Sequence, residues 1–304
     1  MVNHRNRIKK TPGDIIMDTI IYILLTLLAL VCLYPLYQVV VVSFSDPNIV
    51  QKKNGMLLMI EGFQTDAYKM VFSNKNIATG FKNSIFYIVV GTALQLLTTV
   101  TASYVLSKKN AMLKKPIMIY FSITMYFGGG LIPSFLLINQ LGFMNTCWAI
   151  LLPGACSVWD IIIMRTQFVG IPDRLKEAAT IDGASDCTIL FRILLPLSGA
   201  VIAVLVLFSA VNYWNMWYEP MIYLTKRSQY PIQSVLREIL IDSNAQMMAG
   251  AGKTQIKMDV SKNKAIQTLI KYANIVVCTV PILVVYPFFQ KYFVKGVMVG
   301  SLKG

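Results

Sequence analysis

The sequence has little of what catalysis or metal binding requires. His4 is the only histidine among 304 residues, which excludes histidine-based catalytic triads and histidine zinc sites. The five cysteines form no C-x-x-C pair and mostly lie in or beside apolar runs. We therefore expect them to act as small buried hydrophobic residues, in neither a disulfide nor a metal site. No Walker-type glycine loop is present, which excludes ATP binding by that mechanism. We therefore expect a chain without catalysis, metal or cofactor of its own.

Charged residues are also scarce, at 14%, whereas apolar residues make up 56% of the chain. The apolar residues come in runs long enough to cross a bilayer, which excludes a soluble core. A net charge of +14 would suggest a nucleic-acid partner for a soluble chain. In a membrane protein the positive charge indicates instead contact with anionic lipid and a preferred orientation of the chain across the membrane. The sequence therefore predicts an all-α integral membrane protein that binds no nucleic acid.

Six transmembrane helices are predicted from the apolar runs, at residues 15–43, 83–106, 117–139, 147–168, 196–219 and 269–290. Four lysines fall between the second and third runs, and the tails 1–14 and 291–304 are basic. Because cytoplasmic loops are rich in lysine and arginine, we place both termini in the cytoplasm. The transmembrane domain then covers residues 15–290, with extracellular loops at 44–80 and 220–268.

One charged segment, residues 170–196, interrupts the apolar runs, and we call it the connector. Pro172 suits the first turn of a helix, and the alanines that follow let another protein approach closely. Gly183 can take the left-handed conformation that ends a helix, and Ser185 can cap a second helix beginning at Asp186. The connector therefore predicts a helix–turn–helix on one face of the membrane.

The connector also resembles the EAA signature of permease subunits in ATP-binding-cassette importers. The matching residues are Glu177-Ala-Ala, Gly183 and Ile193-x-Leu-Pro196. The segment Asp182-Gly-Ala-Ser185 is similar to the version of this signature in the carbohydrate branch of the family. This sequence has Ala200 at a position where many relatives carry a second proline. Segments such as Ser43-Phe-Ser-Asp-Pro47 and Gly129-Gly-Leu-Ile-Pro133 resemble the MalG-like and LplC-like subgroup. This resemblance covers nearly the whole chain.

The resemblance implies the type I importer permease fold and a multi-pass location in the bacterial plasma membrane. It implies import of oligosaccharides, including complex or uronate-containing ones, by ATP-driven alternating access. The implied partners are a second, different permease subunit, two ATPase subunits that bind ATP and Mg, an extracellular solute-binding lipoprotein and membrane lipid. The residues implied to couple to the ATPase are Glu177, Ala178, Ala179, Asp182, Gly183, Ala184 and Ser185.

Polar and aromatic residues gather at the outer end of the fifth run. At 100° per residue, Asn212, Asn215 and Glu219 share one face, and polar groups on a membrane helix face protein or water. Amide side chains both donate and accept hydrogen bonds, as a polyhydroxylated ligand requires. We predict a substrate path lined by Asn212, Trp214, Asn215, Tyr218 and Glu219. Tyr213 and Trp217 fall on the opposite face, where an interfacial aromatic belt is expected.

The third run contains Gly128-Gly129-Gly130 and Pro133, which an undisturbed helix does not tolerate. Either neighbouring helices pack tightly there or the backbone opens toward a polar cavity, and we add Gly129 and Gly130 to the predicted path. Asp160 in the fourth run is either functional or paired with Arg165 or a backbone group.

Several alternatives stay open at this stage. Loop 220–268 either reaches the binding protein or is disordered. The chain could import another solute, such as an amino acid or a metal, or act as a membrane sensor or scaffold without transport. The sequence does not give the identity and length of the sugar.

Overall fold

The computed structural model describes residues 11–249, 266–285 and 287, with side chains left undescribed at 242–249. All regular elements in these ranges are helices, which confirms the all-α prediction. Four helical segments are long and apolar enough to cross a membrane: Pro12–Ser43, Lys75–Ser107, Trp148–Gly170 and Ile266–Val285. Two bent helix pairs raise the number to six if each pair is one span. The described helices thus accommodate the six predicted spans.

The chain divides into two compact units, which we describe separately. The first unit comprises residues 1–71 and 246–276. Its longest element is α1 (Pro12–Ser43). A capping box formed by Thr11 and Asp14 stabilises the start of this helix. The short helix α2 (Pro47–Lys52) follows, capped by the side chain of Asp46, and α3 (Asp66–Ser73) begins at the end of the unit.

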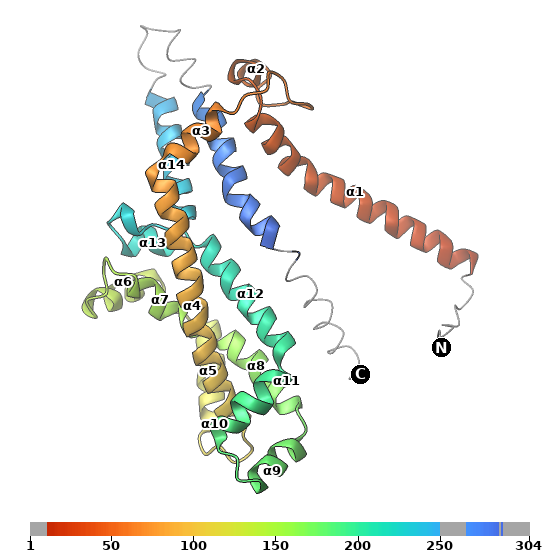
Figure 1. Ribbon diagram of the computed structural model, residues 1–304, viewed down its shortest axis with the longest axis vertical. Coiled ribbons are helices and arrows are strands. Elements are labelled where there is room, and N and C mark those ends of the chain that lie inside the picture. The colour runs from red at the N-terminus through yellow and green to blue at the C-terminus, as the bar shows by residue number, and fades with distance from the viewer. Residues whose placement is uncertain (1–10, 250–265, 286, 288–304) are drawn as a thin grey trace. The chain divides into compact units, whose positions relative to one another are not determined.

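The second unit comprises residues 72–245 and 277–304 and is built around α4 (Lys75–Ser107). This helix runs alongside α8 (Val158–Gly170) and α12 (Gly199–Asn215), as Figure 1 shows. Apolar side chains between them, including Val100, Phe168 and Leu205, form a buried core. These three helices therefore hold the other elements of the unit in place.

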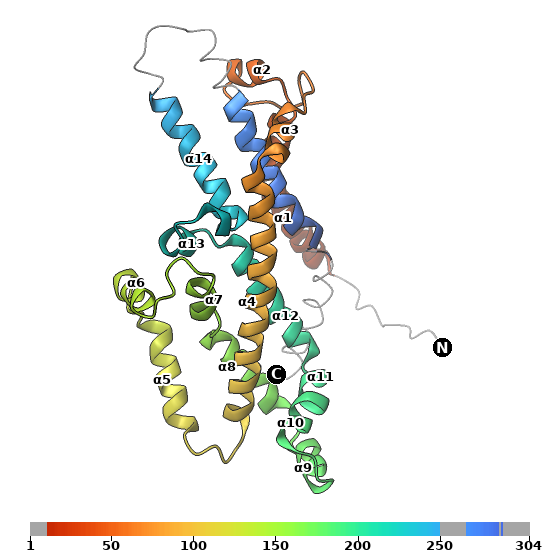
Figure 2. The ribbon, with the colours of Figure 1, turned by 60° about the vertical axis from the view of Figure 1, so that its left-hand side comes forward.

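Several spans of the second unit are broken rather than straight (Figure 2). α5 (Lys114–Tyr126) and α6 (Leu131–Gln140) meet at 116° across the glycine run, where Gly130 has φ +83°. α7 (Trp148–Gly154) is separated from α8 by a short break, after which Ser157 caps α8. Before α12 the chain turns by 83° at Ser198. These breaks expose backbone groups, which is tolerated at membrane depth only beside protein or a polar cavity.

The connector forms α9 (Asp173–Ile181), α10 (Asp186–Ile189), a π-helical turn (Leu190–Leu194) and α11 (Leu195–Leu197).

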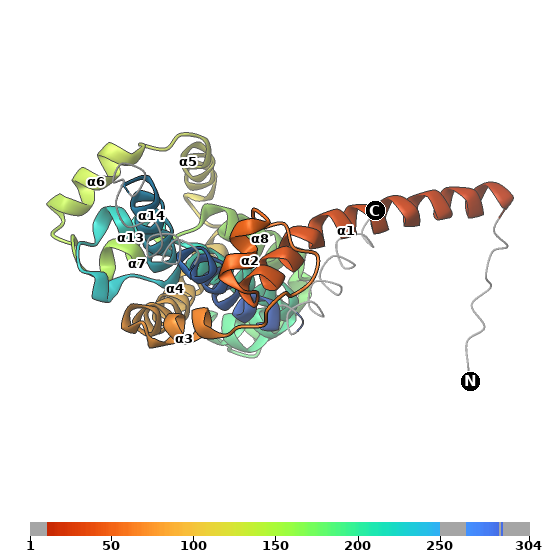
Figure 3. The same ribbon diagram turned by 90° about the horizontal axis from the view of Figure 1, so that it is seen from above.

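After α12 come α13 (Tyr218–Tyr223), a 3₁₀ turn (Arg227–Gln229) and α14 (Ile232–Ala249). Disorder was one alternative for loop 220–268, and it is wrong for the part up to residue 249; residues 250–265 lie outside the described ranges. Figure 3 shows α6, α7 and α13 grouped on one side of the second unit.

Candidate functional site

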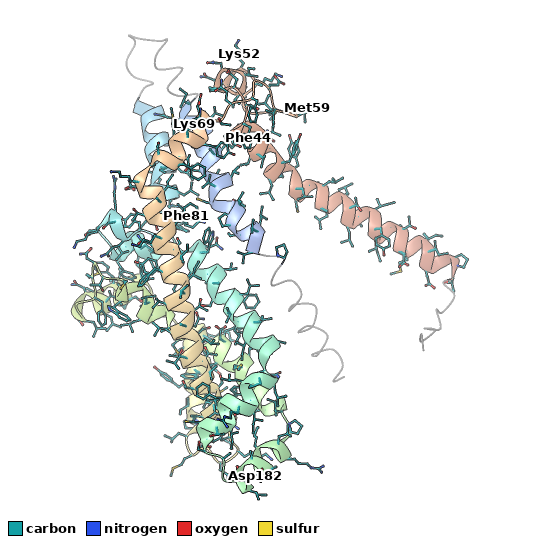
Figure 4. The ribbon with its side chains drawn as sticks, viewed as in Figure 1. Phe44, Lys52, Met59, Lys69, Phe81 and Asp182 are labelled. Atoms are coloured by element: carbon teal, nitrogen blue, oxygen red, sulfur yellow. The ribbon has the colours of Figure 1, made fainter. Side chains whose placement is uncertain are left out.

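The local geometry of the connector agrees with the sequence analysis. Pro172 precedes α9 as its N-cap residue, one position earlier than a first-turn proline. Gly183 has φ +79°, a left-handed conformation that glycine adopts without strain. The hydroxyl of Ser185 accepts a hydrogen bond from the backbone N–H of Thr188 and so caps α10. The result is the predicted helix–turn–helix, with Asp182 at its tip (Figure 4).

The connector has one face toward the protein and one toward solvent. Ala179 and Ala184 pack against the buried core of Phe168 and its neighbours. Among the predicted coupling residues, the exposed ones are Glu177, Ala178, Asp182, Gly183 and Ser185. Leu175 and Ile181 lie on the outer face of α9 and are 46% and 86% exposed. The sequence analysis missed these two residues, although apolar side chains in a charged segment were a visible signal of a docking surface.

Two lysines at the end of α4 hold the connector. Lys108 forms a 2.6 Å ion pair with Asp186, which also accepts a 2.8 Å hydrogen bond from the Tyr104 hydroxyl. Lys109 forms a 2.7 Å ion pair with Asp173 at the start of α9. The hydrogen bond from Lys109 lowers the pKa of Asp173, and the same bond raises the pKa of Lys109. Both connector helices are therefore tied to the helix that forms the centre of the unit.

A cavity of about 930 Å³ lies beside the break between α7 and α8. It is bounded by α6, α7, the end of α12, and α13. Its polar and aromatic lining residues include Gln95, Ser134, Ser157, Asn212, Tyr213, Asn215, Trp217, Tyr218, Glu219 and Tyr223. The structure thus brings four of the predicted path residues, Asn212, Asn215, Tyr218 and Glu219, to one cavity. Gln95 on α4 and Ser157 at the start of α8 come from other helices, whereas Tyr223 lies on α13 with Tyr218 and Glu219. No local sequence pattern marked these three residues.

The helical-wheel argument that grouped these residues holds only in part. α12 ends at Asn215, and Met216 has an extended conformation with φ −68° and ψ 120°. Glu219 therefore lies on α13 and shares the cavity with Asn215 because of the chain bend, and not because of helical periodicity. Trp217 lines the same cavity, so its predicted place on the opposite face is wrong. The Arg237 guanidinium lies 3.6 Å from the centre of the Trp217 ring, in a cation–π contact.

Tyr213 was predicted to lie in an interfacial aromatic belt, and this is also wrong. Its side chain is buried, with 5% exposed, and packs between α4 and α7. A Cβ added at Gly91 would collide with Cζ of Tyr213, and one at Gly154 would collide with its hydroxyl oxygen. Two glycines therefore make room for the ring, so its position depends on three separate helices.

A second cavity, of about 1380 Å³, lies between α4, α8 and α12. Its lining is mainly apolar but includes Gln95, Asp160, Asn212 and Trp214. Trp214 thus belongs to this cavity rather than to the first, while Asn212 and Gln95 line both. The two cavities are consequently separated by a wall to which these two amide side chains contribute.

A buried polar network lies at this wall. The side-chain nitrogen of Gln95 donates a 2.6 Å hydrogen bond to the Asp160 carboxylate, and the hydroxyl of Ser209 donates a 2.6 Å hydrogen bond to the Gln95 oxygen. These side chains are 8%, 6% and 3% exposed, respectively. Of the alternatives considered for Asp160, the pairing with Arg165 is wrong, because the Arg165 side chain donates instead to the Leu106 carbonyl.

Gly129 and Gly130 do not join the other predicted path residues. Both are exposed in the bend between α5 and α6 and are absent from the lining of the two cavities. No side chain approaches within 4 Å of a Cβ built at Gly130, so the tight packing considered for this position is not observed among the described residues. The positive φ of Gly130 accounts for the glycine at this bend.

Comparison with known proteins places the chain among transport components. The family model for the binding-protein-dependent transport system inner membrane component matches residues 96–299. The polygalacturonan/rhamnogalacturonan transport system permease protein YtcP of Bacillus subtilis (strain 168) is 39% identical over 290 residues, covering 95% of this chain and 99% of that protein. Protein LplC of the same organism is 36% identical over 275 residues, covering 90% of each chain.

A solved structure has a similar fold. It is the crystal structure of a bacterial ABC transporter involved in the import of the acidic polysaccharide alginate. The TM-score is 0.83 with 28% sequence identity, and the match covers 94% of this chain and 100% of the other. Both the sequence and the fold therefore resemble those of importer components over almost their whole length.

Proposed function

The chain belongs to the family of binding-protein-dependent transport system inner membrane components, and from this premise we propose that it forms the membrane path for acidic oligosaccharides in an ATP-driven importer. Membership of the family makes it a multi-pass permease subunit of an ABC transporter rather than an enzyme. It also confirms the predicted type I permease fold. A partner permease, an ATPase and a binding protein belong to such a transporter in general.

The proposal for the substrate is based on the lining of the 930 Å³ cavity. Its lining combines amides at Asn212 and Asn215 with aromatic rings at Trp217 and Tyr218. Amides exchange hydrogen bonds with sugar hydroxyls, and aromatic faces pack against the apolar faces of sugar rings. Arg237, stacked on Trp217, places a positive charge beside the cavity, while the Glu219 carboxylate supplies a negative charge in its lining.

The names of the relatives support the acidic class. Polygalacturonan, named for one relative, and alginate, named for the solved importer, are both polymers of sugar acids. Two proteins similar to this chain over nearly its whole length are thus named for substrates with carboxylate groups. The alternatives of a non-sugar solute or a sensor without transport are not favoured by any specific feature of the described residues.

The connector supports the proposed arrangement of partners. Its exposed apolar residues Leu175 and Ile181 provide a surface for a soluble protein, and its inner face packs on the permease core. We expect this surface to dock on one of two separate ATPase subunits, which bind ATP and Mg. A second, different permease subunit and an extracellular solute-binding lipoprotein complete the proposed transporter.

The substrate class is tested by ATPase activity in the reconstituted transporter. The full complex in proteoliposomes is supplied with its binding protein and, in parallel, with oligogalacturonides or with neutral arabino-oligosaccharides of equal length. We expect oligogalacturonides to stimulate ATP hydrolysis several-fold more than the neutral sugars. Equal or greater stimulation by the neutral sugars would reject the acidic class, while stimulation by neither would reject oligosaccharide import.

A further inference from the structure

The loop after α2 exposes a cluster of large apolar side chains. Met56, Leu58 and Met59 are 76%, 73% and 74% exposed, and Phe63 is 68% exposed. Leu57, between them, is only 2% exposed and faces into the unit. The loop is therefore folded with a defined inner side, and its outer side is apolar. A loop surrounded by water would not favour this arrangement.

Two hydrogen bonds hold this loop beside the apolar helix α1. The Tyr37 hydroxyl donates to the Leu58 carbonyl at 2.6 Å, and the Gln38 amide donates to the Gly55 carbonyl at 2.7 Å. Both donors lie before the end of α1 at Ser43. The chain thus leaves α1, forms α2, and then turns back along the helix instead of extending away from it.

The position of these donors along α1 gives the depth of the loop. An apolar bilayer core is crossed by about 20 helical residues. Counted from Asp18, the last charged residue of α1, such a span reaches Gln38. Tyr34 and Tyr37 lie at this level and are about half exposed, as expected for an aromatic residue at a membrane–water boundary. The segment 55–58 is therefore held at the boundary of the hydrocarbon core.

Polar contacts hold α2 and the loop after it together as a hairpin, which comprises residues 46–64. Lys53 and Glu61, which flank the apolar segment, form a 2.5 Å ion pair. Gln64 donates a 3.0 Å hydrogen bond to Asp46, which also caps α2. Gly62 has φ +67°, and a Cβ there would lie 2.8 Å from the Asp46 Cβ, so the turn that returns the loop requires glycine. The hairpin is thus amphipathic.

We propose that residues 56–60 form an interfacial anchor that inserts Met56, Leu58 and Met59 into the bilayer leaflet at the C-terminal end of α1. The partner of this surface is lipid, because the segment is bonded to α1 at the level where that helix meets the boundary of the hydrocarbon core. Figure 4 shows Met59 at the end of α1 and Lys52 on the far side of α2. The inference concerns a surface separate from both cavities and does not depend on the proposed substrate.

The anchor is tested with nitroxide labels in the full complex reconstituted into liposomes. The five native cysteines are first replaced, and one cysteine is introduced at Met59, with Lys52 as the matched control on the same hairpin. Electron paramagnetic resonance then compares collisions with oxygen, which concentrates in lipid, and with a water-soluble nickel chelate. We expect oxygen collisions to dominate at Met59 and nickel collisions to dominate at Lys52.

Two results would overturn the proposal. Nickel collisions at Met59 equal to those at Lys52 would place the loop in water. Weak collisions with both reagents at Met59 would show that another protein covers it. Retained ATPase activity of each labelled complex establishes that the complex is assembled, and a label at Leu58 gives an independent second reading at the same depth.

Discussion

The side-chain nitrogen of Gln95 lies 2.6 Å from a carboxylate oxygen of Asp160, and this contact joins α4 to α8 inside the membrane domain. Ser209 on α12 donates to the other end of the same amide. One glutamine thus connects the three helices that form the centre of the second unit. Because Gln95 also lines both cavities, the contact links the packing of the unit to its inner surface.

This relationship predicts different effects for two substitutions of Asp160. Asp160→Leu leaves the Gln95 amide buried without its acceptor, at a cost of about 1–3 kcal/mol for an unsatisfied group. Asp160→Asn keeps an acceptor oxygen of similar shape. We expect Asp160→Leu to lower the unfolding temperature of the purified complex clearly, and Asp160→Asn to lower it much less. Equal destabilisation by both variants would show that the charge, rather than the hydrogen bond, maintains the packing.

The turn of the connector predicts a second pair of variants. Gly183 is left-handed with φ +79°, and no atom within 4 Å would obstruct a side chain there. Asparagine tolerates this conformation, whereas a β-branched residue does not. We therefore expect Gly183→Val to insert normally but to separate ATP hydrolysis from transport, and Gly183→Asn to retain most coupling. The ratio of sugar imported to ATP hydrolysed checks this, and normal coupling in Gly183→Val would refute the assigned role of the turn.

The orientation of the chain predicts which positions an impermeant thiol reagent can reach. Lys109 and Lys176 lie at the connector end of the second unit, whereas Lys226 lies in the segment between α13 and α14. Single cysteines at Lys109 and Lys176 should react only after the cells are opened, and one at Lys226 should react in intact cells. The reverse labelling pattern would contradict the placement of both termini in the cytoplasm.

Sequence analysis could predict the features that depend on local chemistry. The apolar runs indicated the spans, and the turn at Gly183 with the cap at Ser185 followed from the preferences of single residues. The segment after Asn215 was different, because a helical wheel assumes a continuous helix and α12 ends there. The predicted position of Trp217 was therefore wrong, although the prediction grouped the nearby amide side chains correctly.

Features that depend on several helices could not be read from the sequence. Tyr213 is buried because Gly91 and Gly154, far apart in the chain, both leave room for its ring. Asp160 finds its partner at Gln95, 65 positions away, rather than at the nearby Arg165. In each case a tertiary contact decides between possibilities that local spacing leaves open.

The most direct test of the proposed path is the uptake of labelled oligogalacturonide by the reconstituted transporter carrying Asn215→Leu. Loss of an amide that hydrogen-bonds to sugar hydroxyls costs about 1 kcal/mol for each bond, or roughly a fivefold loss of affinity. Asn139→Leu is the matched control, because Asn139 is exposed on α6 and is not part of the cavity lining. We predict that Asn215→Leu lowers ATP-dependent uptake several-fold at unchanged assembly and basal ATPase activity, while Asn139→Leu does not. Unchanged uptake by Asn215→Leu, or an equal loss in both variants, would contradict a substrate path through this cavity.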